Sequence, residues 1–146
     1  MNDTWIKSFG KLQITDNAIR VSVSMDFIKY YKQFVDKQFR IFSDYPAHGG
    51  HITITQIKIN KSFGFKSYKH LSGKIINFEY NPDIIVGGQS KGFMNFWMKV
   101  RSAEIDKLMK DLGIVQNLHV TVSNTKGGVR PYIWETPKIN KDLKPN

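Results

Sequence analysis

Two short segments of the chain carry the same pattern of residue types, HITI at residues 51–54 and HVTV at residues 119–122. In a β-strand alternate side chains point to the same face, so each segment would place its histidine and threonine on one face and two apolar residues on the other. An imidazole, with an ordinary pKa of about 6.5, can accept or donate a proton at neutral pH. A threonine hydroxyl can donate hydrogen bonds to phosphate oxygens. The paired segments therefore predict acid–base cleavage of a phosphodiester by four catalytic residues, which are His51, Thr53, His119 and Thr121.

Such cleavage requires one histidine to start neutral, as the base, and the other to start charged, as the acid. The sequence leaves open which is which. The other two histidines have weaker claims, because His48 lies in the turn YPAHGGH and His70 in a basic loop. An alternative is a metal site at His48, His51 and Asp44, since imidazole and carboxylate groups bind zinc. The two glycines after His48 fit either an unusual turn or a loop that contacts phosphate.

We expect neither a metal nor a cofactor. The chain has no cysteine, which excludes disulfides, thiolate metal sites and a cysteine nucleophile.

For recognition of a nucleobase the candidates are Tyr132, Trp134 and Glu135, because an aromatic face can stack on a base and a carboxylate can accept from an exocyclic amine. The alternative is that the two aromatic residues only pack the tail onto the body. Trp97 follows Phe96 in an expected strand and is assigned to the core.

The elements that would position these residues follow from hydrophobic periodicity. Each histidine segment begins a strand, and each of these strands follows a helix and a connecting segment. The helix over 25–39 has an apolar stripe and a cap at Ser24 or Asp26, and the helix over 103–112 lies between Ser102 and Gly113. Strands are expected over 18–24, 51–59, 74–80, 92–102 and from 118, with 74–80 and 92–102 as a hairpin-like pair, a further short strand within 81–91 and a loop over 60–73.

This order predicts an α+β fold in two related halves. The length of 146 residues fits a single domain over 1–136, and the charged, proline-bounded residues 137–146 are expected to be disordered.

No signal peptide or long apolar stretch is present, which favours a soluble protein of the cytoplasm. Lys and Arg number 22 against 12 Asp and Glu, a net charge of +10. That charge fits either attraction of a phosphate-bearing ligand or a merely well-solvated surface.

The two H-x-T-x elements resemble the signature of the 2H phosphoesterase superfamily, which includes RNA 2′,3′-cyclic phosphodiesterases and ligase-like enzymes of RNA repair. The segments YPAHGGHITITQIKI, LHVTVSN and RPYIWETPK are similar to those of the phage anti-CBASS phosphodiesterases. Those hydrolases degrade the cyclic oligonucleotides with which bacteria signal infection, and so serve immune evasion by the bacteriophage.

The resemblance implies two pseudo-symmetric lobes of antiparallel strands with flanking helices around a central cleft. It also implies metal-independent attack of a substrate 2′-hydroxyl on the neighbouring phosphodiester, with a linear product. The expected substrate is a cyclic di- or trinucleotide such as 3′3′ cyclic GMP–AMP, met in the host cytoplasm if the chain is phage-encoded. No membrane or stable DNA partner is expected, and the oligomeric state is left open. The alternatives are an RNA-end 2′,3′-cyclic phosphodiesterase and a non-catalytic nucleotide-binding protein.

Overall fold

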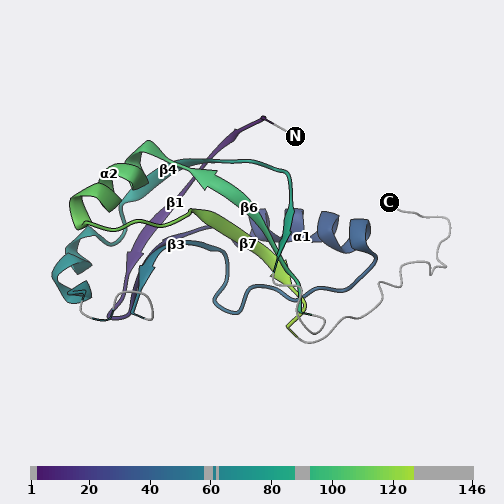
Figure 1. Cartoon of the computed structure of the whole chain (residues 1–146), viewed down its shortest axis with the longest axis horizontal. Helices are drawn as coiled ribbons and strands as arrows, with labels where there is room; N and C mark the ends of the chain where they lie inside the picture. Colours follow the sequence, from purple (N-terminus) through teal and green to yellow (C-terminus); the bar gives the residue numbers. More distant parts are fainter. Residues whose placement is uncertain (1–2, 58–60, 62, 88–92, 127–146) are drawn as a thin grey trace.

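The computed structural model describes residues 3–57, 61, 63–87 and 93–126, and these form one antiparallel sheet with helices packed on it (Figure 1). The predicted α+β class is confirmed. The elements are β1 (Ile6–Ile14), β2 (Ala18–Ser22), α1 (Met25–Phe39), β3 (His51–Gln56), the 3₁₀ helix η1 (Phe65–Leu71), β4 (Ile75–Tyr80), β5 (Ile85–Gly87), β6 (Asn95–Arg101), α2 (Ala103–Leu112) and β7 (His119–Asn124).

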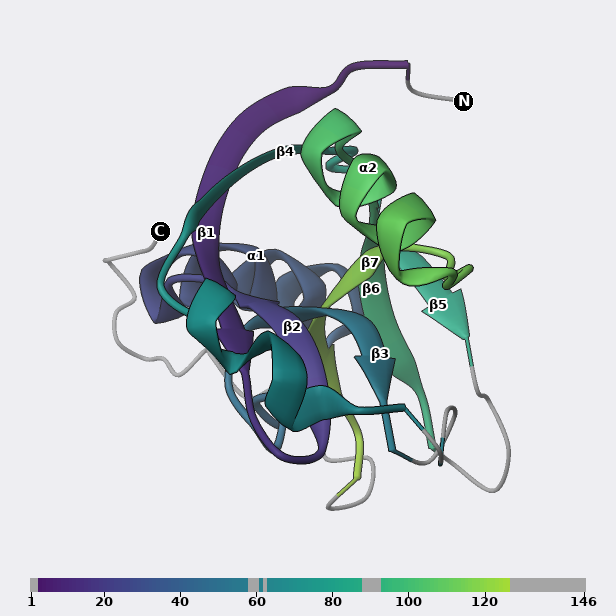
Figure 2. The same cartoon turned by 90° about the vertical axis from the view of Figure 1, so that its left-hand side faces the viewer.

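The strand order in the sheet is β4-β1-β2-β3-β7-β6-β5, with neighbouring strands antiparallel. A further pairing joins β4 to β6, so six strands close into a ring and β5 extends the edge of β6. In Figure 2 the strands β1, β2 and β3 follow one another from left to right, and β5 lies at the far edge. In this order β3 and β7, the two strands that begin with histidine, lie next to each other.

Both helices form where the caps and the periodicity predict them. The Ser24 hydroxyl accepts from the Asp26 amide at the start of α1, and the Ser102 hydroxyl accepts from the Ile105 amide at the start of α2. Gly113 ends α2 in the left-handed conformation. Figure 1 shows α1 beside β7 and α2 beside β4, so each helix packs on a strand from another part of the chain. None of the helices in the described ranges is long and apolar enough to cross a membrane.

The core occupies one face of the sheet. Apolar residues at alternate strand positions form a single cluster with the buried residues of the helices. In the strands around the histidines these core residues are Ile19, Val21, Ile52, Ile54, Phe96, Met98, Val120 and Val122, and the helices add Ile28, Val35, Ile105 and Met109. The alternate positions of the same strands therefore face away from the core.

Several sequence predictions need correction. The strand β1 was not predicted, because only its second half, with Leu12 and Ile14, reaches the core. The expected hairpin-like pair is only partly formed, since β4 pairs with β1 along its length and with β6 at two positions. Phe34, which the helical periodicity places in the apolar stripe of α1, is 44% exposed and contacts the rings of Tyr30 and Tyr31 at the surface.

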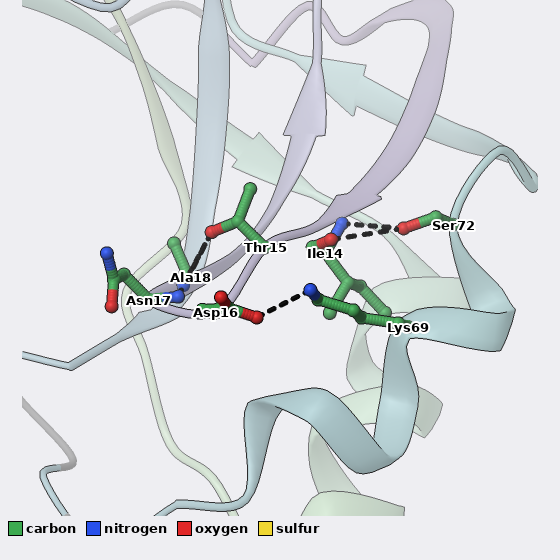
Figure 3. Close-up of polar contacts among 7 residues, drawn as sticks. All are labelled: Ile14, Thr15, Asp16, Asn17, Ala18, Lys69 and Ser72. Carbon is green, nitrogen blue, oxygen red and sulfur yellow. Dashed lines mark hydrogen bonds and ion pairs between the residues drawn. The ribbon is translucent and has the colours of Figure 1, made fainter.

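The predicted loop over 60–73 contains the helix η1. Aromatic side chains explain why this segment adopts a regular structure, because Phe65 is buried and Phe63 stacks on Tyr68. Figure 3 shows how the end of this segment is attached to the turn between β1 and β2. Lys69 forms an ion pair with Asp16, and the Ser72 hydroxyl bonds both the backbone N–H and the carbonyl of Ile14.

Candidate functional site

The two histidine strands are aligned so that the H-x-T segments lie side by side. In the antiparallel pair β3–β7, Ile52 lies opposite Val120, and both side chains are fully buried in the core. Continuing this register by one residue in each direction would set a histidine of one strand opposite a threonine of the other. The four predicted residues are thus brought together on the face opposite the core, where all are half-buried: His51 with Thr121, and Thr53 with His119. We call these four residues the quartet.

Both imidazoles are held by the same kind of hydrogen bond. Nδ1 of His51 lies 3.1 Å from the carbonyl oxygen of Gly49, and Nδ1 of His119 lies 3.1 Å from that of Asn117. A carbonyl oxygen can only accept, so Nδ1 carries the hydrogen in each ring. The other nitrogen, Nε2, is then the one that can exchange a proton with a ligand. It accepts when the ring is neutral and donates when the ring is charged.

A one-residue bulge follows the threonine in each strand. In β3 the pairing with β2 shifts so that Thr53 lies opposite Arg20 but Thr55 lies opposite Ile19, which leaves Ile54 as the extra residue. A bulge interrupts the alternation of faces and bends the strand. Consequently Ile54 and Thr55 are both buried, and the strict alternation predicted over 51–59 holds only through Ile54.

The strand β7 repeats this arrangement. Thr121 lies opposite Trp97 and Ser123 opposite Phe96, so Val122 is the extra residue. Position by position, the residues of β3 and β7 are buried or half-buried in the same pattern. The hydroxyls of Thr55 and Ser123 are both buried without a hydrogen-bond partner among the described residues. The two segments are therefore alike in backbone geometry as well as in residue types.

The glycine pair before His51 has a structural explanation. Gly49 has a φ of +74°, which favours glycine. At Gly50 an added Cβ would lie 2.6 Å from Cγ1 of Ile28 and 2.9 Å from the carbonyl oxygen of Val23. The turn and the close approach of α1 thus require both glycines. Because the Gly49 carbonyl accepts from His51, the same turn also sets the direction of that imidazole.

His51 lies in surroundings that disfavour its charged form. Burial is the largest cause that lowers its pKa below the usual value, and the nearby charges of Arg20, His48 and His119 lower the pKa further. The hydrogen bond to the Gly49 carbonyl acts in the opposite direction. The net effect keeps His51 neutral at neutral pH, the state that a general base needs.

Different side chains flank the quartet on its two sides. On β2, Arg20 lies opposite Thr53 and Ser22 opposite His51. On β6, Trp97 lies opposite Thr121 and Lys99 opposite His119. None of these four flanking residues was predicted for the site. The signal that would have found Arg20 and Ser22 is their alternation with buried Ile19 and Val21 in β2.

The assignment of Trp97 to the core is wrong. Phe96 is fully buried, whereas Trp97 is half-buried on the face of the quartet, since consecutive residues of a strand point to opposite faces. Its indole meets the ring of His119 nearly edge-on, with centroids 5.5 Å apart and planes at 62°. An aromatic surface therefore lies directly beside the second histidine.

The remaining candidates do not belong to the quartet or lie outside the described part of the chain. His48 is exposed in its turn and His70 is exposed in η1. Across the described ranges, no three histidine, aspartate or glutamate side chains are grouped so as to hold a metal ion, so His48, His51 and Asp44 do not form the alternative metal site. Tyr132, Trp134 and Glu135, like the expected tail at 137–146, lie outside the described residues.

Comparison with known proteins identifies no relative of this chain. No protein-family model matches the chain, and neither a curated protein nor a solved structure is significantly similar to it. The interpretation of the site therefore depends on the quartet itself.

Proposed function

We propose that the protein is a metal-independent phosphodiesterase of the 2H phosphoesterase type, with His51 as general base and His119 as general acid. The observation that carries the proposal is the quartet: two imidazoles held alike through Nδ1 and two threonines across from them on adjacent strands. The halves of the sheet that meet at β3 and β7 would then be the two lobes of this fold.

The chemistry assigns a role to each member of the quartet. Nε2 of His51 removes the proton from a substrate 2′-hydroxyl, and that oxygen attacks the adjacent phosphorus while the bond to the leaving 5′-oxygen breaks. Nε2–H of His119 gives the leaving oxygen its proton. The hydroxyls of Thr53 and Thr121 donate hydrogen bonds to the non-bridging oxygens as negative charge builds there. The product is a 2′,3′-cyclic phosphate, which water can open to a 3′-phosphate with the histidine roles reversed.

The proposed substrate is a cyclic di- or trinucleotide messenger, such as 3′3′ cyclic GMP–AMP, and the biological role is a phage countermeasure to CBASS defence. The net charge of +10 supports an anionic substrate. The half-buried indole of Trp97 offers a nucleobase a surface next to His119. Tyr132, Trp134 and Glu135 stay predictions for recognition of the base.

The test is incubation of purified protein with 3′3′ cyclic GMP–AMP in excess chelator, followed by chromatography and mass spectrometry. A linear product is expected, and the analogue that lacks the 2′-hydroxyls should stay intact. Cleavage of RNA ends with 2′,3′-cyclic phosphates, but of no cyclic dinucleotide, would transfer the proposal to the RNA-repair branch. Tight binding with unchanged nucleotide recovered would make the protein a nucleotide-binding module.

A further inference from the structure

We propose that Arg20 is the phosphate-binding cation of this site, and that its guanidinium holds the non-bridging oxygens of the bound phosphodiester from the β2 side of the quartet. Neither the sequence pattern nor the H-x-T segments assign this residue a role. The inference deepens the proposed function and rests on it for the identity of the phosphodiester, whereas the anion site itself can be measured separately.

The position of Arg20 in the sheet directs its side chain to the quartet. Its neighbours in β2, Ile19 and Val21, are fully buried in the core, so Arg20 faces the opposite side. Its partner across the strands is Thr53, whose hydroxyl is proposed to contact the same phosphate. The charge of Arg20 also acts on His51, so the guanidinium lies near that imidazole.

The side chain of Arg20 has an unfilled hydrogen-bonding requirement. Its Nε is buried and has no hydrogen-bond partner among the residues that the structure describes. The ion pairs in the described part of the chain join other cations to carboxylates, namely Lys32 to Asp36, Lys69 to Asp16 and Arg101 to Glu79. A buried N–H without an acceptor is unfavourable, and a cation without an anion is too. Arg20 as a whole is only half-buried, and a bound phosphate would supply the missing anion, because guanidinium binds phosphate in a planar, two-pronged geometry.

The two sides of the quartet differ in the residue that lies opposite the threonine. Where Arg20 lies opposite Thr53, Trp97 lies opposite Thr121. An otherwise matched pair of segments is thus flanked by a cation on the β2 side and by an aromatic ring on the β6 side. The phosphate is therefore drawn towards Arg20 and His51, and the nucleoside that leaves lies towards Trp97 and His119.

The experiment measures anion binding separately from catalysis. Inorganic phosphate is titrated into the wild type, Arg20→Gln, Arg20→Lys and the control Lys107→Gln, with the histidine ring signals followed by NMR. Lys107 is exposed on α2, and its substitution removes the same charge. Arg20→Gln should weaken phosphate binding about tenfold or more, as expected for loss of a charge-assisted hydrogen bond. Arg20→Lys should retain part of it, and the control should match the wild type.

Cleavage of 3′3′ cyclic GMP–AMP by the same proteins separates the two proposals. If Arg20→Gln binds phosphate as tightly as the control, or if the wild type binds none, the inference is wrong even where the wild type cleaves the substrate. If phosphate binding depends on Arg20 but the wild type cleaves nothing, the anion site stands and the proposed function fails. Should Arg20→Gln not fold, Arg20→Lys decides, and wild-type affinity in that variant would overturn the inference.

Discussion

At the scale of single residues, His51 and His119 are alike in two ways and differ in their neighbours. Each donates its Nδ1–H to a backbone carbonyl, and each lies across from a threonine of the adjacent strand. His51 is close to the cation Arg20, and His119 touches the ring of Trp97. The shared features suit both imidazoles to proton transfer through Nε2. The differing features distinguish their roles, because a positive charge near His51 favours its neutral form.

Replacement of either histidine should abolish most activity. His51→Ala and His119→Ala are each expected to lower kcat/KM by about a hundred- to ten-thousand-fold, the usual contribution of a group that transfers a proton. Both side chains are half-buried on the face opposite the core, so the fold should persist. The measurement is the initial rate on 3′3′ cyclic GMP–AMP, with circular dichroism as the folding check. His70→Ala, at an exposed position of η1, is the control and should keep wild-type activity.

The pH dependence should report the neutral state of His51. A protonated base cannot accept a proton, so kcat/KM should fall as the pH drops through the pKa of His51. Because burial and Arg20 lower that pKa, the acid limb of the profile should lie below about pH 6.5. Arg20→Gln removes a positive neighbour and should move the acid limb to higher pH. A wild-type profile that is flat in this range, or whose acid limb lies well above the ordinary imidazole value, would contradict the assignment of His51 as the base.

At the scale of elements, the turn before β3 holds the first histidine in place. Gly50→Ala would push a methyl group against Ile28 and the Val23 carbonyl, and overpacking of this kind typically lowers the free energy of unfolding by about 1–3 kcal/mol. Urea denaturation of the wild type and variant measures the change. The matched control is Gly64→Ala, where the new Cβ would meet only the Ser67 hydroxyl at 3.5 Å. Equal destabilisation by the two substitutions would show that close packing at Gly50 is not the cause.

The same elements show what the sequence can predict. Capped periodic segments gave both helices, and alternation gave the strands of the quartet, because these signals are local. The register between β3 and β7 and the two bulges depend on partner strands, so no single segment could reveal them. For the same reason, nothing in the sequence distinguishes Arg20 from the other cations of a well-solvated surface. Its neighbours in space, Thr53 and His51, become visible only when β2 and β3 are paired.

At the scale of the whole molecule, the closed order of strands and the overall charge act together. The strand order sets β3 beside β7, although η1, three strands and α2 separate them along the chain. The chain as a whole carries a net charge of +10, and a positive field of this kind attracts phosphates over distances greater than a hydrogen bond. Topology therefore assembles the quartet, and under the proposed function the charge would raise the frequency with which an anionic substrate reaches it.

This electrostatic contribution should appear as a dependence on salt. Exposed charges are screened over about 10 Å at 0.1 M ionic strength, so added sodium chloride should lower kcat/KM severalfold while kcat changes less. Steady-state kinetics in a salt series measures both. Lys107→Glu changes the net charge by two units at an exposed position of α2 and should reduce the salt dependence without lowering kcat. If kcat/KM did not respond to salt while the thermal stability stayed constant, attraction by the overall charge would have no part in substrate capture, and binding would rest on local contacts such as Arg20.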